Sequence, residues 1–500
     1  MTDYIIKLST EQLSGSITYV NSPDPPSSPT LEVEDFWRIR LKISEVIMRN
    51  TIIDNLRGIC MLGVIGIHIG SLALAPNNFT LYLFLEILSR YSVPSFFFIS
   101  GYGLACTDKG LLSGSRLNYI DFMKKRLRGA GLPYLSWSLF YMLYFWLILP
   151  PGFVSWNPLH VAYVLFFGLG CYHLYFMVIL LWFYASYPLW RRLLRIIIHQ
   201  SIPFMLVLLF IFQLAFNWWT THPGLNTAGW SVLAKNFFDY RLNYLPLHYL
   251  LIFISGGLAA CYWEKFIALL RRYSAMVCVI FAASVAWDVQ SCYEAVTVKG
   301  YTLIDLANTY HQLSPQGLCY TVGSLLFFCL ALDWLERKAQ AKAHTKAPNA
   351  LQSIPQAASY TEAPNALQSI PQAASHTEAP LVVASDISTT NSLSPRKLTT
   401  SWVLASGSCH RKVTERGSLA NLLYKAISIL SAYSMLIYFV HPLLLDWLSS
   451  AYNHFGIIMT VKKVALSYVL LVLGSLALSI LLTKAFEKCS TAKLLFTGKR

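Results

Sequence analysis

Long apolar stretches alternate with short polar connections along most of the chain. About ten of these stretches are long enough to cross a membrane as helices, because the hydrocarbon core takes ~20 apolar residues of helix. The predicted spans are roughly 52–75, 81–104, 131–150, 172–190, 203–220, 246–262, 275–291, 316–334, 426–449 and 463–485. The pattern therefore predicts an all-α fold, a polytopic bundle of about ten transmembrane helices.

Composition agrees with a chain that is solvated largely by lipid. Apolar residues make up 55% of the 500 residues and charged residues 13%, with a mean hydropathy of +0.49. Soluble domains carry about 45–50% apolar and about 25% charged residues. A charged side chain near the bilayer centre costs several kcal/mol, which explains the depletion of charge. Membrane lipid is thus the first predicted partner.

Basic residues gather in the even-numbered connections between the predicted spans. These connections hold Lys109, Arg116, Lys124, Lys125, Arg126 and Arg128, then Arg191, Arg192 and Arg195, and then Lys265, Arg271 and Arg272. The odd-numbered connections hold fewer bases, among them Lys235, Arg241 and Lys299. Cytoplasmic connections are enriched in Lys and Arg, so both termini are predicted to face the cytoplasm. The formal charge of +15 then reflects topology, and we expect no nucleic-acid partner.

The chain is predicted to consist of five parts. They are a soluble segment (1–50), a membrane domain with spans 1–8 (51–334), an insertion (335–425), spans 9–10 of the membrane domain (426–485) and a cytoplasmic tail (486–500). Within the insertion, the sequence APNALQSIPQAAS at 347–359 recurs unchanged at 363–375. A segment rich in Ala, Pro, Gln and Ser buries too little apolar surface to fold. We therefore predict that the insertion is a disordered cytoplasmic tether.

Ionisable residues inside the first span are the strongest candidates for function. Asp54, Arg57 and His68 lie on this one apolar helix, where such groups are costly and therefore mark functional sites by default. Arg57 and His68 are eleven positions apart, about three helical turns or roughly 16 Å, so they share one face. Asp54 is one turn before Arg57 and is placed to orient its guanidinium. The alternative is a structural ion pair at the helix end with a buried neutral histidine.

The second span carries a further charged pair and two helix-perturbing residues. Glu86 and Arg90 are one turn apart, so they either pair with each other or join the site. Pro94 and Gly101 are expected to kink or loosen the helix, and irregular backbone at membrane depth usually lines a cavity.

Four motifs, taken in order, resemble those of the membrane acyltransferase 3 family, which includes bacterial polysaccharide O-acetyltransferases. They are Asp54-Asn55-Leu56-Arg57-Gly58 followed by His68, the segment from Val93 to Tyr102 (VPSFFFISGY), Tyr172-His173-Leu174-Tyr175-Phe176, and the segment from Ile437 to Pro442 (IYFVHP). The resemblance runs from about residue 49 to 485 and includes the number of spans. The N-terminal segment and the repeat insertion fall outside it.

The resemblance implies a membrane acyltransferase that moves an acyl group, most often acetyl, from acetyl-CoA or another acyl-CoA to a hydroxyl of a glycan or lipid-linked sugar. His68 would be the general base that removes the hydroxyl proton, or alternatively would carry the acyl group as an acyl-imidazole. Arg57 would position the donor, with Asp54 orienting Arg57. His173, Tyr438 and His441 would bind the acceptor or stabilise the oxyanion, although interfacial hydrogen bonding explains the two histidines equally well.

Donor binding is implied for the basic cluster Lys124, Lys125, Arg126 and Arg128. Family members usually carry an Arg-x-x-Arg pair before a proline, and here Pro133 follows the cluster. Either Lys125 and Arg128 form this pair, with Lys replacing the first Arg, or Arg126 is its first member and Gly129 occupies the second position. Lysine offers a point charge rather than a bidentate fork, so the two alignments differ in chemistry.

Two other functional classes fit some of the same residues. A carrier or flippase for a polar glycan or anion would also have about ten spans with polar groups near the midplane, but the sequence shows no matched halves. A metal-binding protein would use His68, His173, His441 and Asp446, although we expect no metal cofactor. By analogy with the family, the predicted location is the bacterial inner membrane.

Overall fold

The protein is predominantly helical. A computed structural model describes residues 50–73, 78–222, 224, 226–309, 311–344 and 419–499. The structure is 82% helical, and no strand occurs in these residues, which confirms the all-α prediction. Most of the N-terminal segment and of the repeat insertion lies outside the described residues.

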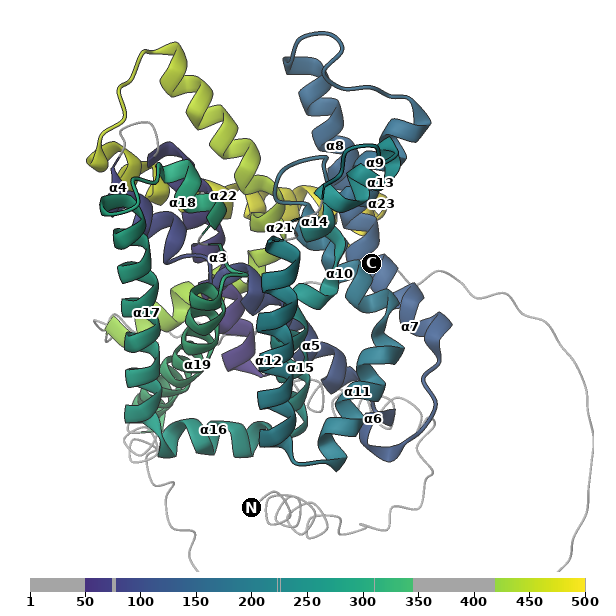
Figure 1. The fold of residues 1–500 in the computed structure, drawn as a ribbon, viewed down its shortest axis with the longest axis vertical. Coiled ribbons are helices and arrows are strands. Elements are labelled where there is room, and N and C mark those ends of the chain that lie inside the picture. Colours follow the sequence, from purple (N-terminus) through teal and green to yellow (C-terminus); the bar gives the residue numbers. More distant parts are fainter. Residues whose placement is uncertain are drawn as a thin grey trace, which may run out of the picture. The chain divides into compact units, whose positions relative to one another are not determined.

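The helices follow one another with short connections (Figure 1). From the first span to the middle of the chain they are α3 (Thr51–Ala73), α4 (Phe79–Tyr82), η1 (Leu83–Ile87), α5 (Ser92–Thr107), α6 (Gly110–Ser113), α7 (Tyr119–Arg126), η2 (Leu127–Gly131), α8 (Leu132–Ile148), α9 (Pro158–Phe167), α10 (Tyr175–Ala185), α11 (Tyr187–His199) and α12 (Ile202–Thr221). The remaining helices are α13 (Val232–Asp239), α14 (Arg241–Tyr244), η3 (Pro246–Tyr249), α15 (Leu250–Cys261), α16 (Trp263–Arg272), α17 (Ser274–Thr297), α18 (Leu303–Thr309), α19 (Pro315–His344), α21 (Leu419–His454), α22 (Val461–Glu487) and α23 (Ser490–Thr497).

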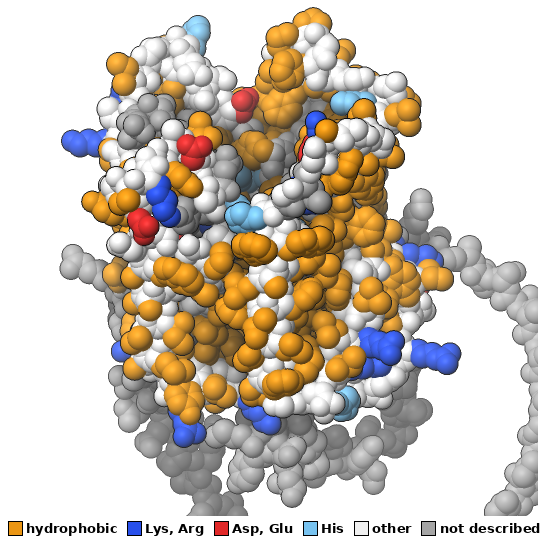
Figure 2. Space-filling model, in the orientation of Figure 1, with side chains coloured by type: hydrophobic (Ala, Val, Ile, Leu, Met, Phe, Trp, Pro, Cys, Tyr) orange, Lys and Arg blue, Asp and Glu red, His pale blue; other side chains and the backbone are white. Residues whose placement is uncertain are grey.

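Eight helical segments in the described part of the chain are long and apolar enough to cross a membrane. They are Thr51–Gly70, Phe79–Thr107, Tyr119–Ile148, Ile202–Thr221, Ser274–Thr297, Pro315–Gln340, Leu419–His454 and Val461–Glu487. Each coincides with a predicted span, and the bundle is therefore polytopic. Hydrophobic side chains form a broad band over these helices, while Lys and Arg gather at the end where α6, α7 and α16 lie (Figure 2).

The other two of the ten predicted spans do not form single straight helices that are long enough to cross a membrane. The apolar run at 246–262 ends where Pro246–Cys261 meets Trp263–Arg272 at an angle of 102°, so it counts as a span only as part of this bent pair. The run at 172–190 forms only the short helix α10, Tyr175–Ala185. Eleven residues of helix extend about 16 Å, roughly half of the hydrocarbon thickness.

Contacts divide the chain into two units, one of residues 1–339 and 420–500 and one of residues 340–419. The helices that carry the motifs all belong to the first unit. Its core is built around α3, which contacts α5, η1 and α22.

The closest helix pair of the bundle is α5 with α15, and two glycines make this approach feasible. A methyl group at Gly101 would lie 2.0 Å from the carbonyl oxygen of Phe253, and one at Gly256 would lie 2.0 Å from that of Phe98. In lipid, the hydrophobic effect does not drive helices together, so close van der Waals contact through small residues stabilises their packing. Gly101 therefore permits close packing within an unbroken helix, where the sequence suggested a kink.

Replacing Gly101 by alanine is expected to destabilise the bundle by about 1–3 kcal/mol, because the added methyl group overpacks the contact with α15. The measurement is the midpoint of thermal unfolding of the purified protein in detergent. Gly103→Ala is a matched control on the same helix, since no atom lies within 4 Å of a methyl group there. The control is expected to leave the midpoint unchanged or to raise it, as alanine favours helix over glycine by about 1 kcal/mol. Equal midpoints for the two variants would contradict this account of the contact.

Irregular backbone occurs just before two of the membrane helices. The π-helical turn η1 precedes α5, and the π-helical turn η2 precedes α8. Such turns rotate the side chains that follow them and are frequent at functional sites. The first is followed by Arg90 and the second follows Arg126, both of which line cavities described below.

Candidate active site

One face of α3 runs along two cavities, each with a volume of about 430 Å³. Arg57 and Met61 line the first, which we call the arginine cavity. Val64 and His68 line the second, which we call the histidine cavity. Their spacing of four, three and four residues keeps all of these side chains on one side of the helix. The shared face expected for Arg57 and His68 is therefore present, with the two residues in different cavities.

The two cavities share a wall of aromatic side chains. Phe96 of α5, Phe176 of α10 and Tyr438 of α21 line both of them. The hydroxyl of Tyr438 donates a hydrogen bond to the backbone carbonyl of His173 at 2.7 Å, which fixes the ring. This wall lies between the arginine cavity and the histidine cavity.

Three histidines from separate helices and turns meet beside the histidine cavity. The ring centroids of His68 and His441 lie 5.2 Å apart with an interplanar angle of 26°, and those of His173 and His441 lie 5.4 Å apart. Tyr172 covers another side of His68, with 4.7 Å between ring centroids. His68 and His173 line the cavity, whereas His441 is fully buried behind them.

Hydrogen bonding fixes the tautomer of His441. Its Nδ1 lies 3.0 Å from the carbonyl oxygen of Ile437. A carbonyl can only accept, so Nδ1 carries the hydrogen and the neutral ring presents a bare Nε2. This Nε2 and both ring nitrogens of His173 are buried without a hydrogen-bond partner among the described residues. Unsatisfied buried polar atoms are costly, so these nitrogens are the groups that a bound ligand would satisfy.

Arg57 and Asp54 form the expected ion pair at the start of α3. Nη1 of Arg57 lies 3.3 Å from Oδ1 of Asp54. The Arg57 side chain is 38% exposed and reaches the arginine cavity. Asp54 thus contacts the guanidinium that it was expected to orient.

The basic cluster near α7 is split between the arginine cavity and the surface. Of its four members, Arg126 lines the cavity, while the exposed side chains of Lys124, Lys125 and Arg128 do not. Nη2 of Arg126 donates to the Thr107 hydroxyl at 2.9 Å, whereas its buried Nε has no partner in the described part of the chain.

The position of Gly129 bears on the two alignments of the Arg-x-x-Arg pattern. Gly129 lines the arginine cavity together with Arg126, and a methyl group at Gly129 would meet open space. The geometry favours Arg126 and Gly129 as the two positions that face a ligand, so one of the two guanidinium groups usual in the family is missing here.

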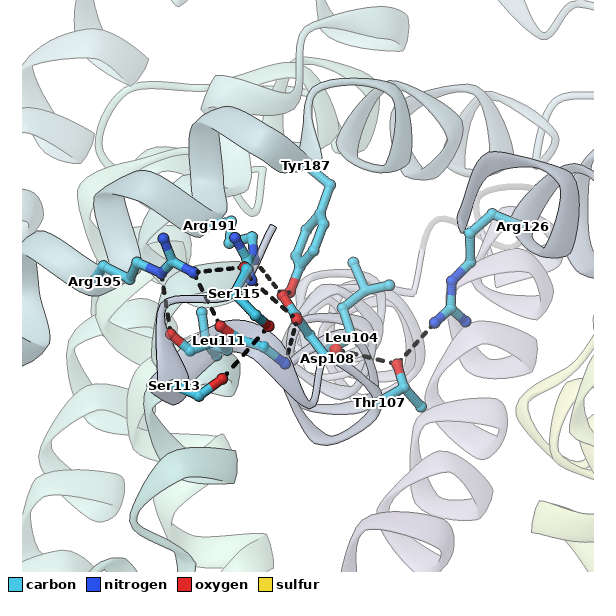
Figure 3. Close-up of polar contacts among 11 residues, drawn as sticks. Leu104, Thr107, Asp108, Leu111, Ser113, Ser115, Arg126, Tyr187, Arg191 and Arg195 are labelled. Atoms are coloured by element: carbon cyan, nitrogen blue, oxygen red, sulfur yellow. Dashed lines mark hydrogen bonds and ion pairs between the residues drawn. The ribbon is translucent and has the colours of Figure 1, made fainter. Parts of the chain in front are cut away.

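A polar network holds the connection that leads from α5 to α7 (Figure 3). Asp108 accepts hydrogen bonds from Nε of Arg191 at 2.5 Å and from the hydroxyl of Tyr187 at 3.2 Å. Arg195 donates to the carbonyl oxygens of Gly110 and Leu111. These contacts anchor the start of the connection, one residue beyond the Thr107 that binds Arg126. Arg191 and Arg195 of α11 thus have structural partners in addition to the topological role expected for them.

The sequence allowed Glu86 and Arg90 either to pair with each other or to join the site. The structure shows the pairing and also places Arg90 at a cavity. Their side chains form an ion pair at 2.6 Å, and Arg90 also lines the histidine cavity.

Several polar residues of the histidine cavity were not predicted from the sequence. They are Thr221, Arg241, Asn243, His311 and Gln312. One signal was available, because Arg241 is a base in an odd-numbered connection that otherwise holds few of them. The approach of the 311–312 turn to α14 depends on tertiary packing, which periodicity does not report.

His68, His173 and His441 adjoin one another, as the metal-binding hypothesis would require. Among the residues that the structure describes, no group of three or more His, Cys, Asp or Glu side chains is arranged to hold a metal ion. Asp446, the fourth ligand of that hypothesis, accepts a hydrogen bond from the Tyr144 hydroxyl at 2.6 Å.

Comparison with known protein families identifies the chain. The family model described as an acyltransferase domain, that of the acyltransferase 3 family, matches residues 50–358, which is more than half of the sequence. A search of the curated proteins and of the solved structures found no significant match. The family match covers Arg57, His68, Arg126 and His173 but ends before α21, which supplies Tyr438 and His441 to the same site. The chain therefore belongs to the acyltransferase 3 family and is a multi-pass membrane acyltransferase.

Proposed function

We propose that the protein transfers an acetyl group from acetyl-CoA, bound in the arginine cavity, to a hydroxyl of a sugar or cell-surface glycan in the histidine cavity. The observation that carries this proposal is the single face of α3 that places Arg57 in one cavity and His68 in the other, with a shared aromatic wall between them. A donor with a charged head and a long neutral arm matches this arrangement, because its charge and its reacting group are widely separated.

The arginine cavity suits the phosphate groups of an acyl-CoA. Arg57 and Arg126 supply guanidinium groups, which bind phosphate through charge-assisted hydrogen bonds. The unpartnered Nε of Arg126 is one donor available for this purpose. The exposed Lys124, Lys125 and Arg128 lie close by in sequence and would raise the local concentration of the anionic donor.

Acyl transfer would take place at His68. Its imidazole removes the proton of the acceptor hydroxyl as the oxygen attacks the thioester carbonyl, forming the new C–O bond. The C–S bond then breaks, and the departing thiolate takes the proton from the imidazolium. His173, whose ring nitrogens are unpartnered, would donate to the developing oxyanion, while His441 supports His68 from behind. For the thioester to reach His68, the rings of Phe96, Phe176 and Tyr438 must separate, and their closure behind it would exclude water.

The charge pattern supports one orientation in the membrane. The basic connections around α7, α11 and α16 would face the cytoplasm, where acyl-CoA is made, with both termini on the same side. The histidine cavity would then open toward the opposite side, from which a glycan or lipid-linked sugar enters. The corresponding location is the bacterial inner membrane.

The test is binding and hydrolysis of radiolabelled acetyl-CoA by the purified full-length protein. We expect wild type to bind and slowly hydrolyse the donor, and Arg57→Ala to bind it about 10–100-fold more weakly, because a charged hydrogen bond contributes ~1.5–3 kcal/mol. A wild-type protein that neither binds nor hydrolyses acetyl-CoA, while moving a glycan or anion across vesicles, would replace the enzyme by a carrier.

A further inference from the structure

The histidine cavity is lined by cationic and hydrogen-bond-donating side chains in addition to its aromatic wall. Arg90, Arg241 and His311 line it, together with Asn243 and Gln312, whose amide N–H groups already donate to the Phe167 carbonyl oxygen and the Tyr249 hydroxyl. No Asp or Glu is among the lining residues that the structure describes. A neutral sugar would need a balance of donors and acceptors, whereas this set is biased toward donors.

Arg241 is held in place by neutral partners. Its Nε donates to the carbonyl oxygen of Thr220 at 2.8 Å, and its Nη1 donates to that of Phe238 at 2.7 Å. The guanidinium also stacks on the Phe238 ring, 4.4 Å from its centroid. These contacts fix the planar fork and leave the Nη2 side for a ligand. Burial lowers the pKa of Arg241 below its ordinary value, which nearby Asp239 and Tyr244 only partly oppose, so an anion at Nη2 would relieve a desolvated charge.

Arg90 differs from Arg241 because its charge is already compensated. It pairs with Glu86 at 2.6 Å, and buried Asp288 acts on it electrostatically. Arg241 forms no direct ion pair among the described residues, although Asp239 acts on it electrostatically, so it is the arginine of the cavity that is available to an anion.

His311 adds a directed donor. The backbone N–H of Leu313 donates to Nδ1 of His311 at 3.1 Å, so Nδ1 is the acceptor and Nε2 carries the hydrogen. Burial, and to a smaller extent electrostatic interaction with Arg90 and His222, lowers the pKa of His311 to about 4, which keeps the ring neutral at physiological pH. A neutral ring with this tautomer presents one N–H donor without adding charge.

We infer that the acceptor sugar carries an anionic group, a carboxylate or a phosphate, which Arg241 and His311 bind while a hydroxyl of the same sugar faces His68. This inference rests on the proposed function, because it assigns the histidine cavity to the acceptor. It narrows the acceptor to acidic glycans or to sugars linked through phosphate. Arg241 then determines specificity, since it recognises a part of the substrate away from the reacting hydroxyl.

The test compares three probes on the purified full-length protein, with binding followed by thermal stabilisation. The probes are methyl β-glucuronide for the carboxylate, glucose 1-phosphate for the phosphate and methyl β-glucoside as the neutral sugar. We expect one of the anionic probes to bind wild type at least about 10-fold more tightly than the neutral sugar, and the one that binds distinguishes the two anionic classes. In Arg241→Gln this preference is expected to disappear, and in Arg241→Lys to be partly retained, because the charge persists without the planar fork.

Lys235→Gln is the matched control, since Lys235 is an exposed base in the same connection and does not line the cavity. It is expected to keep the wild-type preference. Equal binding of all three probes, binding of none, or a preference that survives in Arg241→Gln would overturn the inference. Acetyl-CoA binding and hydrolysis, measured on the same samples, separate the two proposals. Donor turnover without anion preference removes only the inference, whereas anion preference without donor binding removes the proposed function.

Discussion

Replacing His68 by alanine is expected to lower acetyl-CoA hydrolysis and acyl transfer by about 10²–10⁴-fold, the typical contribution of a general base. His68 is the histidine of α3 that lines the cavity, and its ring stacks on His441 and contacts Tyr172. Loss of the imidazole removes the group that takes the hydroxyl proton but leaves Arg57 and Arg126 in place. The measurement is the rate of CoA release from radiolabelled acetyl-CoA, with donor binding expected to remain near wild type.

The matched control is His160→Ala, because His160 lies on α9 and lines neither cavity. Wild-type rates are expected for this control. Label that stays covalently attached to wild type after denaturation, and is absent from His68→Ala, would select the acyl-imidazole route over the general-base route. A His68→Ala protein that is folded, binds the donor and turns it over at the wild-type rate would exclude both roles.

Replacing Arg126 by alanine is expected to weaken acetyl-CoA binding by about 10–100-fold. Arg126 is the member of its basic cluster that lines the arginine cavity, and the alanine variant also loses the hydrogen bond to Thr107. The measurement is the dissociation constant for acetyl-CoA, obtained by equilibrium binding in detergent at fixed ionic strength, because surface charge effects vary with salt.

Lys124→Ala provides the comparison, since Lys124 is exposed on α7 and is two residues away from Arg126. Its removal is expected to change affinity by less than about 3-fold at physiological salt, since an isolated exposed charge is largely screened. If Lys124→Ala and Arg126→Ala weaken binding equally, diffuse surface charge rather than the cavity attracts the donor.

The membrane bundle could be predicted from the sequence because a helix that crosses the hydrocarbon core needs a long apolar run, which is visible in the sequence. Eight predicted spans coincide with helices long enough to cross a bilayer. The apolar run at 172–190 was predicted as one span because composition does not reveal where a helix breaks. Here the chain turns at Ser186 between the apolar helix α10 and the amphipathic helix α11, whose first turn contains Pro188.

The candidate site was predictable where residues share a helix and less so where they come together from different ones. The eleven-residue spacing of Arg57 and His68 placed both on one face of α3, as the cavities show. The approach of His173 and His441 to His68 was implied only by the family resemblance and by the metal-binding alternative. Arg241 was not predicted as a site residue because a charge in a connection usually sets topology. Its packing against Phe238 depends on the folded α13–α14 segment.

The same limit applies to the choice between Lys125 and Arg126. Adjacent helix positions point about 100° apart, so the two side chains face different surroundings, and the packing of α7 and of the η2 turn that follows it decides which one faces the cavity. π-Helical turns have no reliable sequence signature, so their effect on side-chain direction is known only from the folded structure.

The contacts of α21 with the rest of the bundle allow the length of the preceding sequence to vary without displacing Tyr438 and His441. Direct contacts hold the helix in place, among them the hydrogen bond from Ser428 to Asn55 at 2.8 Å and the one from the Tyr141 hydroxyl to the carbonyl oxygen of Phe439 at 2.5 Å. The position of α21 is thus determined by these contacts and not by the length of the polypeptide that precedes it. We therefore expect a change in the length of the sequence between α19 and α21, where the sixteen-residue repeat lies, to leave the positions of Tyr438 and His441 unchanged.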